Sequence, residues 1–383
     1  MTAPVRKLGY RPELDGVRAC AVLAVLLYHL TFLVPWLRHV GQGGYLGVDL
    51  FFVLSGLLIT EILVADVDPV GDSDSAPNAG RGVRIDLGDF YQRRARRLLP
   101  ALFAFLVLTL AYYQLAHSDG KAQARGLLRV LTYTLYGRPT ASNFPFGLSQ
   151  VWTLVVEWEF YIAWSIALVI LLLLRVPKQV IGWLAVLGVA VCSLIRIWLL
   201  HHDGNVVLNY HLGVLRFQDM LAGCAIALLP MSQRIPNWVR SLGLLFLIFA
   251  TVRANYLDSW VYQYGFLLTA LSTAAIVAPR NRRWVVDRFL ASKPVVWVGV
   301  ISYSLYLWSV FSVSEVGGRS RSWPLALRAV AVLVVAFALA SLSYYQVERR
   351  FRARSRRAQP GGEHQALRTG GDQGLGQARV ADQ

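Results

Sequence analysis

Long apolar runs recur along almost the whole chain, and they constrain its fold more than any other feature of the sequence. A helix rises about 1.5 Å per residue, so roughly 20 apolar residues cross the hydrocarbon core of a bilayer. Ten runs approach or reach this length, and they cover residues 17–37, 45–64, 98–116, 151–174, 179–200, 211–230, 238–253, 259–278, 295–314 and 325–347. Because helices satisfy their own backbone hydrogen bonds in lipid, the sequence predicts an all-α, polytopic integral membrane protein with about ten transmembrane helices.

The distribution of the 38 Lys and Arg residues predicts how these helices are oriented. If both termini are cytoplasmic, most of the cations fall on cytoplasmic segments, as the positive-inside rule requires, and the number of spans is even. The net charge of +16 then reflects topology and contact with membrane lipid, and it does not indicate nucleic acid as a partner. We expect a multi-pass protein of the inner, cytoplasmic membrane.

Three segments fall outside the pattern of spans. The short apolar run 127–136 is broken by Arg129, and we interpret it as an interfacial or re-entrant segment, with an eleventh span as the alternative. Residues 65–84 and the tail 353–383 are rich in Gly and polar residues and are predicted to be disordered. Residues 1–352 are therefore expected to form one membrane domain, followed by a basic, Gly- and Gln-rich cytoplasmic tail.

The sequence shows no pattern of metal ligands. Its three cysteines, Cys20, Cys192 and Cys224, all lie in apolar runs and are spaced far apart. Thiols in such surroundings usually pack in a protein core, so we expect neither a metal site nor a permanently bound cofactor.

Arg18 and His29 stand out in the first apolar run because ionisable groups are costly at membrane depth. Eleven residues at about 100° each complete roughly three turns, so the two side chains share one helix face about 16 Å apart. The alternative for His29 is a hydrogen-bonded structural histidine. The interpretation that we favour is a general base, since imidazole titrates near neutral pH.

Six segments at the edges of the runs resemble one known family when they are taken together and in order. They read YRPELDGVR (10–18), GVDLFFVLSG (47–56), DFYQRRARRLLP (89–100), QVWTLVVEWEFY (150–161), GVISYSLYLW (299–308) and YQVERRF (345–351). This set resembles the acyltransferase-3 family of integral membrane acyltransferases. The resemblance implies about ten spans and transfer of an acyl group, commonly acetyl, from cytoplasmic acyl-CoA to a hydroxyl. It also places the family's functional Arg and His at Arg18 and His29, and its Arg-x-x-Arg pair at Arg94 and Arg97.

A dense group of arginines precedes the third run: Arg93, Arg94, Arg96 and Arg97. One interpretation is a topology anchor that contacts lipid headgroups. The other is a site for a phosphate-bearing donor, because guanidinium groups bind phosphate well. On the predicted topology Arg11 and Arg18 lie at the same membrane edge. We therefore expect Arg11, Arg18, Arg93, Arg94 and Arg97 to bind acyl-CoA.

Glu157 is the second candidate catalytic residue. On the predicted topology it lies about 9 Å below the start of its span, and His29 lies about 12 Å below the outer end of the first run. Similar depths would allow Glu157 to orient the imidazole or to hold the acceptor. The alternative is a structural carboxylate paired with Arg196 or Arg216. Glu159 points about 200° away and is less favoured.

Other residues are expected to support the site or the packing. Asp15 is expected to pair with Arg11 or Arg18, or to cap the first helix. Arg216 and Asp219 are expected to pair within one helix, with a role in the donor site as the alternative. Ser55, next to Gly56, is interpreted as a close-packing position, because spacing alone places no base beside it. Trp152, Tyr161 and Tyr303 are expected as supporting aromatic residues, in membrane-belt or packing positions.

The chain departs from the resembled family at two histidine positions, where it has Gln150 and Ser309, and Thr153 replaces a serine. These changes put in doubt any scheme that needs two histidines. We expect an O-acyltransferase that uses acyl-CoA as co-substrate, with His29 as general base. Its acceptor is a cell-envelope glycan or a glycosylated natural product such as a macrolide. A transporter or flippase for an acylated or anionic substrate is the alternative, although the broken half-repeats typical of many transporters are missing from the pattern.

Overall fold

The computed structural model describes residues 10–67, 87–116, 146–230, 234–279 and 284–351. Across these ranges every regular element is helical. The main helices are α1 (Pro12–Leu30), α3 (Gly47–Val67), α4 (Leu87–Ala116), α6 (Trp152–Leu173), α7 (Lys178–Asp203), α9 (Gly213–Leu228), α10 (Asn237–Arg253), α11 (Phe266–Val277), α13 (Lys293–Val300), α14 (Ser302–Arg319) and α15 (Leu325–Ser343). Short elements join them: η1 (Pro35–Leu37), α2 (Arg38–Gly41), η2 (Gly44–Leu46), η3 (Phe146–Val151), α8 (Val206–His211), η5 (Val261–Gly265), α12 (Asp287–Leu290) and η6 (Tyr344–Glu348). Each of the ten predicted runs is helical over most of its length, so the all-α class is confirmed.

Five of the described helical segments are long and apolar enough to cross a membrane, and six qualify if the bent pair α13 and α14 counts as one span. The two members of that pair are inclined by 71°. The described helices therefore support a multi-pass helical protein, and the number of ten spans stays a prediction. The helices α9 and α10 have 16 and 17 residues, and α1 carries three charged residues in its first two turns. These helices are marginal as independent spans.

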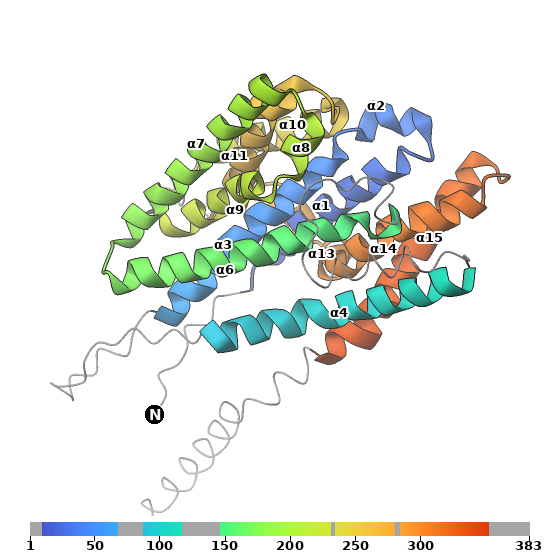
Figure 1. Ribbon diagram of the computed structural model, residues 1–383, viewed down its shortest axis with the longest axis horizontal. Coiled ribbons are helices and arrows are strands. Elements are labelled where there is room, and N and C mark those ends of the chain that lie inside the picture. The colour runs from blue at the N-terminus through green and yellow to red at the C-terminus, as the bar shows by residue number, and fades with distance from the viewer. Residues whose placement is uncertain (1–9, 68–86, 117–145, 231–233, 280–283, 352–383) are drawn as a thin grey trace, which may run out of the picture.

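The central helices α1 and α3 lie between two groups of helices (Figure 1). On one side α3 packs on α9, which packs in turn on α7, and α10 packs on α11. On the other side α14 packs on α15, and α1 contacts both α13 and α14. The helix α4 runs along the outer edge of this second group and contacts η6, α14 and α15.

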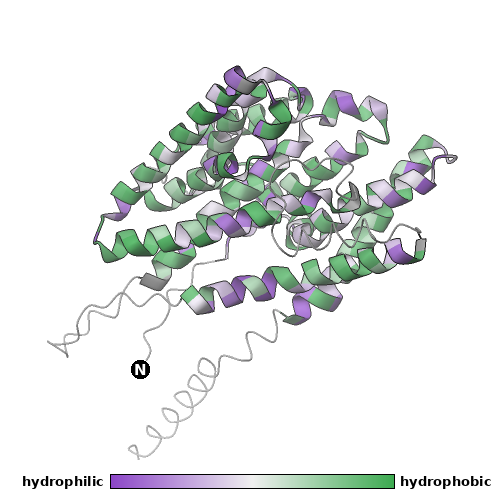
Figure 2. Ribbon diagram, in the orientation of Figure 1, coloured by the Kyte–Doolittle hydropathy of each residue, from purple (hydrophilic) through white to green (hydrophobic). Residues whose placement is uncertain are grey.

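Outward-facing apolar side chains continue along α6 and α7, where Figure 2 shows long hydrophobic stretches. On α6 the exposed apolar residues Ile162, Ile166, Ile170 and Leu173 recur every three or four positions. This is the spacing of one helix face. A large exposed apolar face of this kind is stable in lipid and not in water, which agrees with a membrane protein.

Several predicted boundaries differ from those of the structure. The first run was expected to be helical to residue 37, but α1 ends at Leu30 and the chain turns before Pro35. The proline lacks the amide hydrogen that a continuing helix would need. The helix α4 begins at Leu87, so the arginine group is itself helical. The interfacial segment 127–136, most of residues 65–84 and the tail 353–383 lie outside the described residues.

Two glycines bring α3 and α9 into close contact. A Cβ atom at Gly56 would lie 1.9 Å from the carbonyl oxygen of Met220, and one at Gly223 would lie 2.1 Å from that of Val53. Small residues at such a crossing allow two backbones to approach, as in many membrane helix pairs. The contact fixes the position of α3, which supplies one wall of the site described below.

We expect Gly223→Ala to lower the free energy of unfolding by about 1–3 kcal/mol, because the added methyl group meets backbone that cannot move aside. The measurement is the unfolding midpoint of the purified protein in detergent. Gly318→Ala is the matched control, since a Cβ there meets nothing within 4 Å. Equal stability of the two variants would contradict the close-contact interpretation.

Candidate active site

A pocket lies where α1, α3, α4, α6 and α14 meet. The pocket is thus bounded by the central helices α1 and α3, by α6, which contacts α3, α7 and α9, and by α4 and α14 of the second group. Its lining residues are Arg18, Val48, Phe51, Phe52, Ser55, Arg94, Arg97, Leu98, Thr153, Leu154, Glu157, Tyr161, Ser302, Tyr303 and Tyr306. Apolar, aromatic and hydroxyl side chains thus surround three guanidinium groups and one carboxylate.

The cationic wall of the pocket comes from α1 and α4. Arg94 and Arg97 are three residues apart and share the face of α4 that lines the pocket. Arg18 lines the pocket from α1. Arg94 donates to the hydroxyl of Tyr161 at 2.6 Å, and its guanidinium lies 4.4 Å from the centre of that ring. Arg93, which was also expected to bind the donor, does not line this pocket. It forms an exposed ion pair with Asp89 one turn earlier.

Glu157 sits at the centre of a chain of polar contacts in this pocket. Its Oε1 atom accepts hydrogen bonds from the hydroxyls of Ser55 and Tyr161. Because Tyr161 also accepts from Arg94, the chain runs from a guanidinium to a phenol, a carboxylate and a serine. The alternative pairing of Glu157 with Arg196 or Arg216 is not found.

The start of α1 is held by ion pairs. Arg11 pairs with Glu61 of α3 at 3.3 Å, and Arg18 pairs with Asp15 at 3.1 Å, as one of the expected pairings for Asp15 proposed. Tyr10 also donates to Asp15 at 2.9 Å. Partial desolvation, and then the bond to Asp15, raise the pKa of Tyr10, so its hydroxyl remains a donor at neutral pH. The N-cap residue of α1, Arg11, makes no capping hydrogen bond through its side chain, and Asp15 lies in the first turn, where an acid is favoured.

His29 is not among the residues that line this pocket. It is the last residue but one of α1, beside the rings of Tyr28 (5.5 Å between centroids) and Phe32 (6.4 Å). Its Nδ1 atom is buried without a hydrogen-bond partner among the described residues. Glu157 lines the same pocket as Arg18, and the match in depth between Glu157 and His29 stays a prediction. It assumes a common outer boundary for the two spans, and α1 ends at Leu30, before that boundary.

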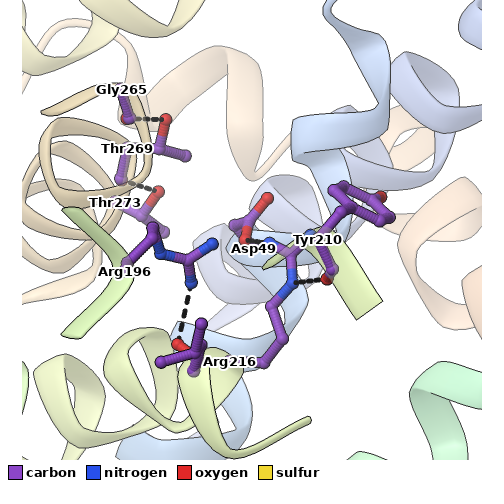
Figure 3. Close-up of polar contacts among 8 residues, drawn as sticks. Asp49, Arg196, Tyr210, Arg216, Gly265, Thr269 and Thr273 are labelled. Carbon is purple, nitrogen blue, oxygen red and sulfur yellow. Dashed lines mark hydrogen bonds and ion pairs between the residues drawn. The ribbon is translucent and has the colours of Figure 1, made fainter. Parts of the chain in front are cut away.

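A second polar cluster, fully buried, lies between α3, α7 and α9. Figure 3 shows Arg216 reaching between Asp49, which it contacts at 2.5 Å, and the backbone carbonyl of Tyr210 at 3.1 Å. Arg196 of α7 donates to the carbonyl of Leu215 at 2.9 Å. The expected pair within one helix, Arg216 with Asp219, is wrong. Arg216 reaches instead to the first turn of α3, where a carboxylate is available to balance its charge.

The remaining predicted residues act through packing or backbone contacts. Tyr303 lines the pocket and donates to the carbonyl of Leu98 at 3.0 Å. Trp152 does not line it; its ring lies 5.8 Å from the guanidinium of Arg216. Two of the positions that depart from the family, Gln150 and Thr153, form hydrogen bonds with residues of α14. Gln150 donates to the carbonyl of Leu307 at 2.7 Å, and Thr153 contacts the Tyr306 hydroxyl at 2.9 Å.

We expect Arg216→Met to lower the free energy of unfolding by about 3–5 kcal/mol, because Asp49 loses its ion-pair partner inside the bundle. Both side chains of this pair are at most 1% exposed. The double variant Arg216→Met/Asp49→Asn, which removes both charges, should recover a large part of the loss. Chemical unfolding in detergent measures both. A double variant as unstable as the sum of its two single variants would contradict a coupled pair.

The fold and the pocket define a multi-pass helical membrane protein with a cation-lined site around a hydrogen-bonded carboxylate. The chain belongs to the acyltransferase-3 family, whose acyltransferase domain matches residues 11–345. It is 30% identical over 388 residues to the putative peptidoglycan O-acetyltransferase YrhL of Bacillus subtilis (strain 168), a match that covers 91% of this chain and 56% of the relative. The peptidoglycan O-acetyltransferase OatA of Listeria monocytogenes is 28% identical over 363 residues, covering 88% of this chain and 55% of the relative.

A putative O-acetyltransferase of Staphylococcus aureus (strain MSSA476) is 32% identical over 334 residues, with 81% of this chain and 52% of the relative covered. The chain therefore spans about half the length of the curated relatives that it matches. No solved structure matches the chain significantly. The chain thus carries the acyltransferase domain of this family over residues 11–345, and the relatives compared above are named O-acetyltransferases.

Proposed function

We propose that the chain transfers a short acyl group, acetyl in the first instance, from cytoplasmic acyl-CoA to a hydroxyl of a glycan. One observation carries this proposal: Arg18, Arg94 and Arg97 converge on the pocket in which Glu157 accepts hydrogen bonds from two hydroxyls. Cations that can hold a phosphate-bearing donor are thereby combined with a base that can accept the proton of an alcohol.

The donor is proposed from the chemistry of the cationic wall. Guanidinium groups bind phosphate through paired hydrogen bonds, and coenzyme A carries several phosphate oxygens at one end. Arg18, Arg94 and Arg97 would contact them directly. Arg11 and Arg93 lie outside the lining and would act at longer range, since both are engaged in ion pairs. Acyl-CoA is a co-substrate in this scheme, and no permanently bound cofactor is invoked.

The acceptor is proposed from the relatives, two of which are named peptidoglycan O-acetyltransferases. A hydroxyl-bearing cell-envelope glycan is therefore the first candidate, and the sugar of a glycosylated natural product such as a macrolide is the second. The proposal also includes ten spans, cytoplasmic termini and a location in the cytoplasmic membrane. The clustering of Lys and Arg supports this orientation.

Two candidate bases define two routes for the proton of the hydroxyl. In the direct route the acceptor attacks the thioester while His29 takes its proton. The thioester would then lie near His29, and the rise of about 16 Å from Arg18 is comparable to the length of a pantetheine arm. In the second route, which we call stepwise, Glu157 accepts the proton of the hydroxyl inside the pocket. Both routes have the same substrates and products.

Arg94→Gln and Arg97→Gln should each weaken acyl-CoA binding about tenfold or more, because each removes a charged hydrogen-bond donor worth roughly 1.5–3 kcal/mol. Added salt should weaken binding to the unchanged protein in the same direction. Equilibrium binding of labelled acetyl-CoA to protein in lipid nanodiscs measures both effects. Lys178→Gln, at the start of α7 and outside the lining, is the control. Affinity that survives both arginine substitutions would remove the proposed donor site.

The direct route predicts that His29→Ala lowers acyl transfer by roughly 10²–10⁴-fold, the usual contribution of a general base. Binding of acyl-CoA should persist, since His29 does not line the donor pocket. The assay is transfer of labelled acetyl from acetyl-CoA to a soluble glycan fragment, with Glu157→Gln measured in parallel. Full transfer by the His29 variant would exclude the histidine as the base.

A further inference from the structure

Ser55 and Glu157 meet in the pocket although they are 102 residues apart in the chain. The Ser55 hydroxyl, on α3, donates to Glu157 Oε1, on α6, and both side chains line the pocket and are only partly buried. A serine whose proton already points at a carboxylate has the arrangement of an activated nucleophile. Spacing along the chain gave no sign of this, so Ser55 was expected only to pack.

A third group orients the carboxylate. Tyr161 donates to the same Oε1 atom and accepts from Arg94 at 2.6 Å. Nucleophile, base and orienting group therefore form a connected chain, which is the general logic of triad sites. The arginine at the end of the chain also provides positive charge near the point where an oxyanion would develop.

The two helices that carry this pair are fixed against each other. Trp164 of α6 donates to Thr60 of α3 at 2.9 Å, one to two turns from the Ser55–Glu157 contact. Gly56 presses α3 against the backbone at Met220. Groups held on rigid helices in this way keep the short separation that nucleophilic attack requires.

Buried apolar side chains separate Arg18 from His29 along α1. Val22 and Val25 occupy the face of α1 between Arg18 and His29, at four and seven residues after Arg18. They are 0% and 2% exposed and pack in the hydrophobic core. Ser55 and Glu157, in contrast, line the same pocket as the arginines, so they are the polar groups nearer to a thioester bound there.

We propose that the acyl group passes through Ser55. The Ser55 Oγ attacks the thioester carbon and forms an ester, the carbon–sulfur bond breaks, and the serine proton passes through Glu157 to the departing thiolate. In the second step the acceptor oxygen attacks the ester carbon, and its proton passes through Glu157 to the Ser55 oxygen as that bond breaks. This inference rests on the proposed acyl-CoA donor and selects the stepwise route over direct attack with His29 as base.

The test is to trap the intermediate. Purified protein in nanodiscs is mixed with labelled acetyl-CoA in the absence of acceptor, and covalently bound label is located by peptide mass spectrometry. We expect one acetyl group on Ser55, released when a glycan fragment is added. Ser55→Ala should bind acetyl-CoA, form no acyl-protein and lose transfer by about 10²-fold or more. Ser55→Cys should be acylated as a thioester that neutral hydroxylamine cleaves, which keeps the test informative if the alanine variant misfolds.

One control variant and two possible outcomes decide the result. Ser312→Ala removes a buried hydroxyl that bonds within α14, away from the pocket, and should form the acyl-protein normally. Transfer without any acyl-protein, with Ser55→Ala as active as the parent, would overturn the relay and leave the proposed function intact. Absence of acetyl-CoA binding and transfer in the parent protein would instead overturn the proposed function.

Discussion

The ion pair between Asp49 and Arg216 holds the structure together around its site. Two full charges in an apolar bundle are tolerable only when each faces the other, because the cost of desolvating an unpaired ion far exceeds that of burying a paired one. Arg216 is also surrounded by rings, with Tyr210 at 4.2 Å and Phe266 at 4.4 Å from its guanidinium carbon. Since Asp49 begins α3, this contact fixes the helix that carries Val48, Phe51 and Ser55 into the pocket.

The bundle thus contains two separate clusters of charged side chains. The buried cluster joins acids and bases within protein, and its charges serve packing. The pocket instead gathers three guanidinium groups and one carboxylate along a lining that is open enough for a ligand. Arg94 belongs to the pocket because α4 begins earlier than its apolar run. The helix therefore presents its arginines in register, with Arg94 and Arg97 on the same face.

The helices could be predicted from the sequence because apolar length and helical periodicity act locally. Arg18, Arg94 and Arg97 were also predictable, since ionisable residues beside apolar runs are rare and costly. The pairing of Ser55 with Glu157 and that of Arg216 with Asp49 could not be predicted. They join residues 102 and 167 positions apart, and the register between two helices depends on packing that one sequence does not reveal. The end of α1 could not be predicted for a related reason: the chain turns before Pro35 and the helix stops at Leu30.

The carboxylate of Glu157 also has a mechanical consequence. It accepts hydrogen bonds from Ser55 on α3 and from Tyr161 on its own helix, so the side chain proposed to carry protons during acyl transfer also joins two helices. Selection on reaction rate and selection on membrane stability therefore act on one side chain and cannot be satisfied independently. Diversification of such a chain towards new acyl groups is easier at Phe51, Phe52 and Leu154, which shape the pocket without joining its polar chain.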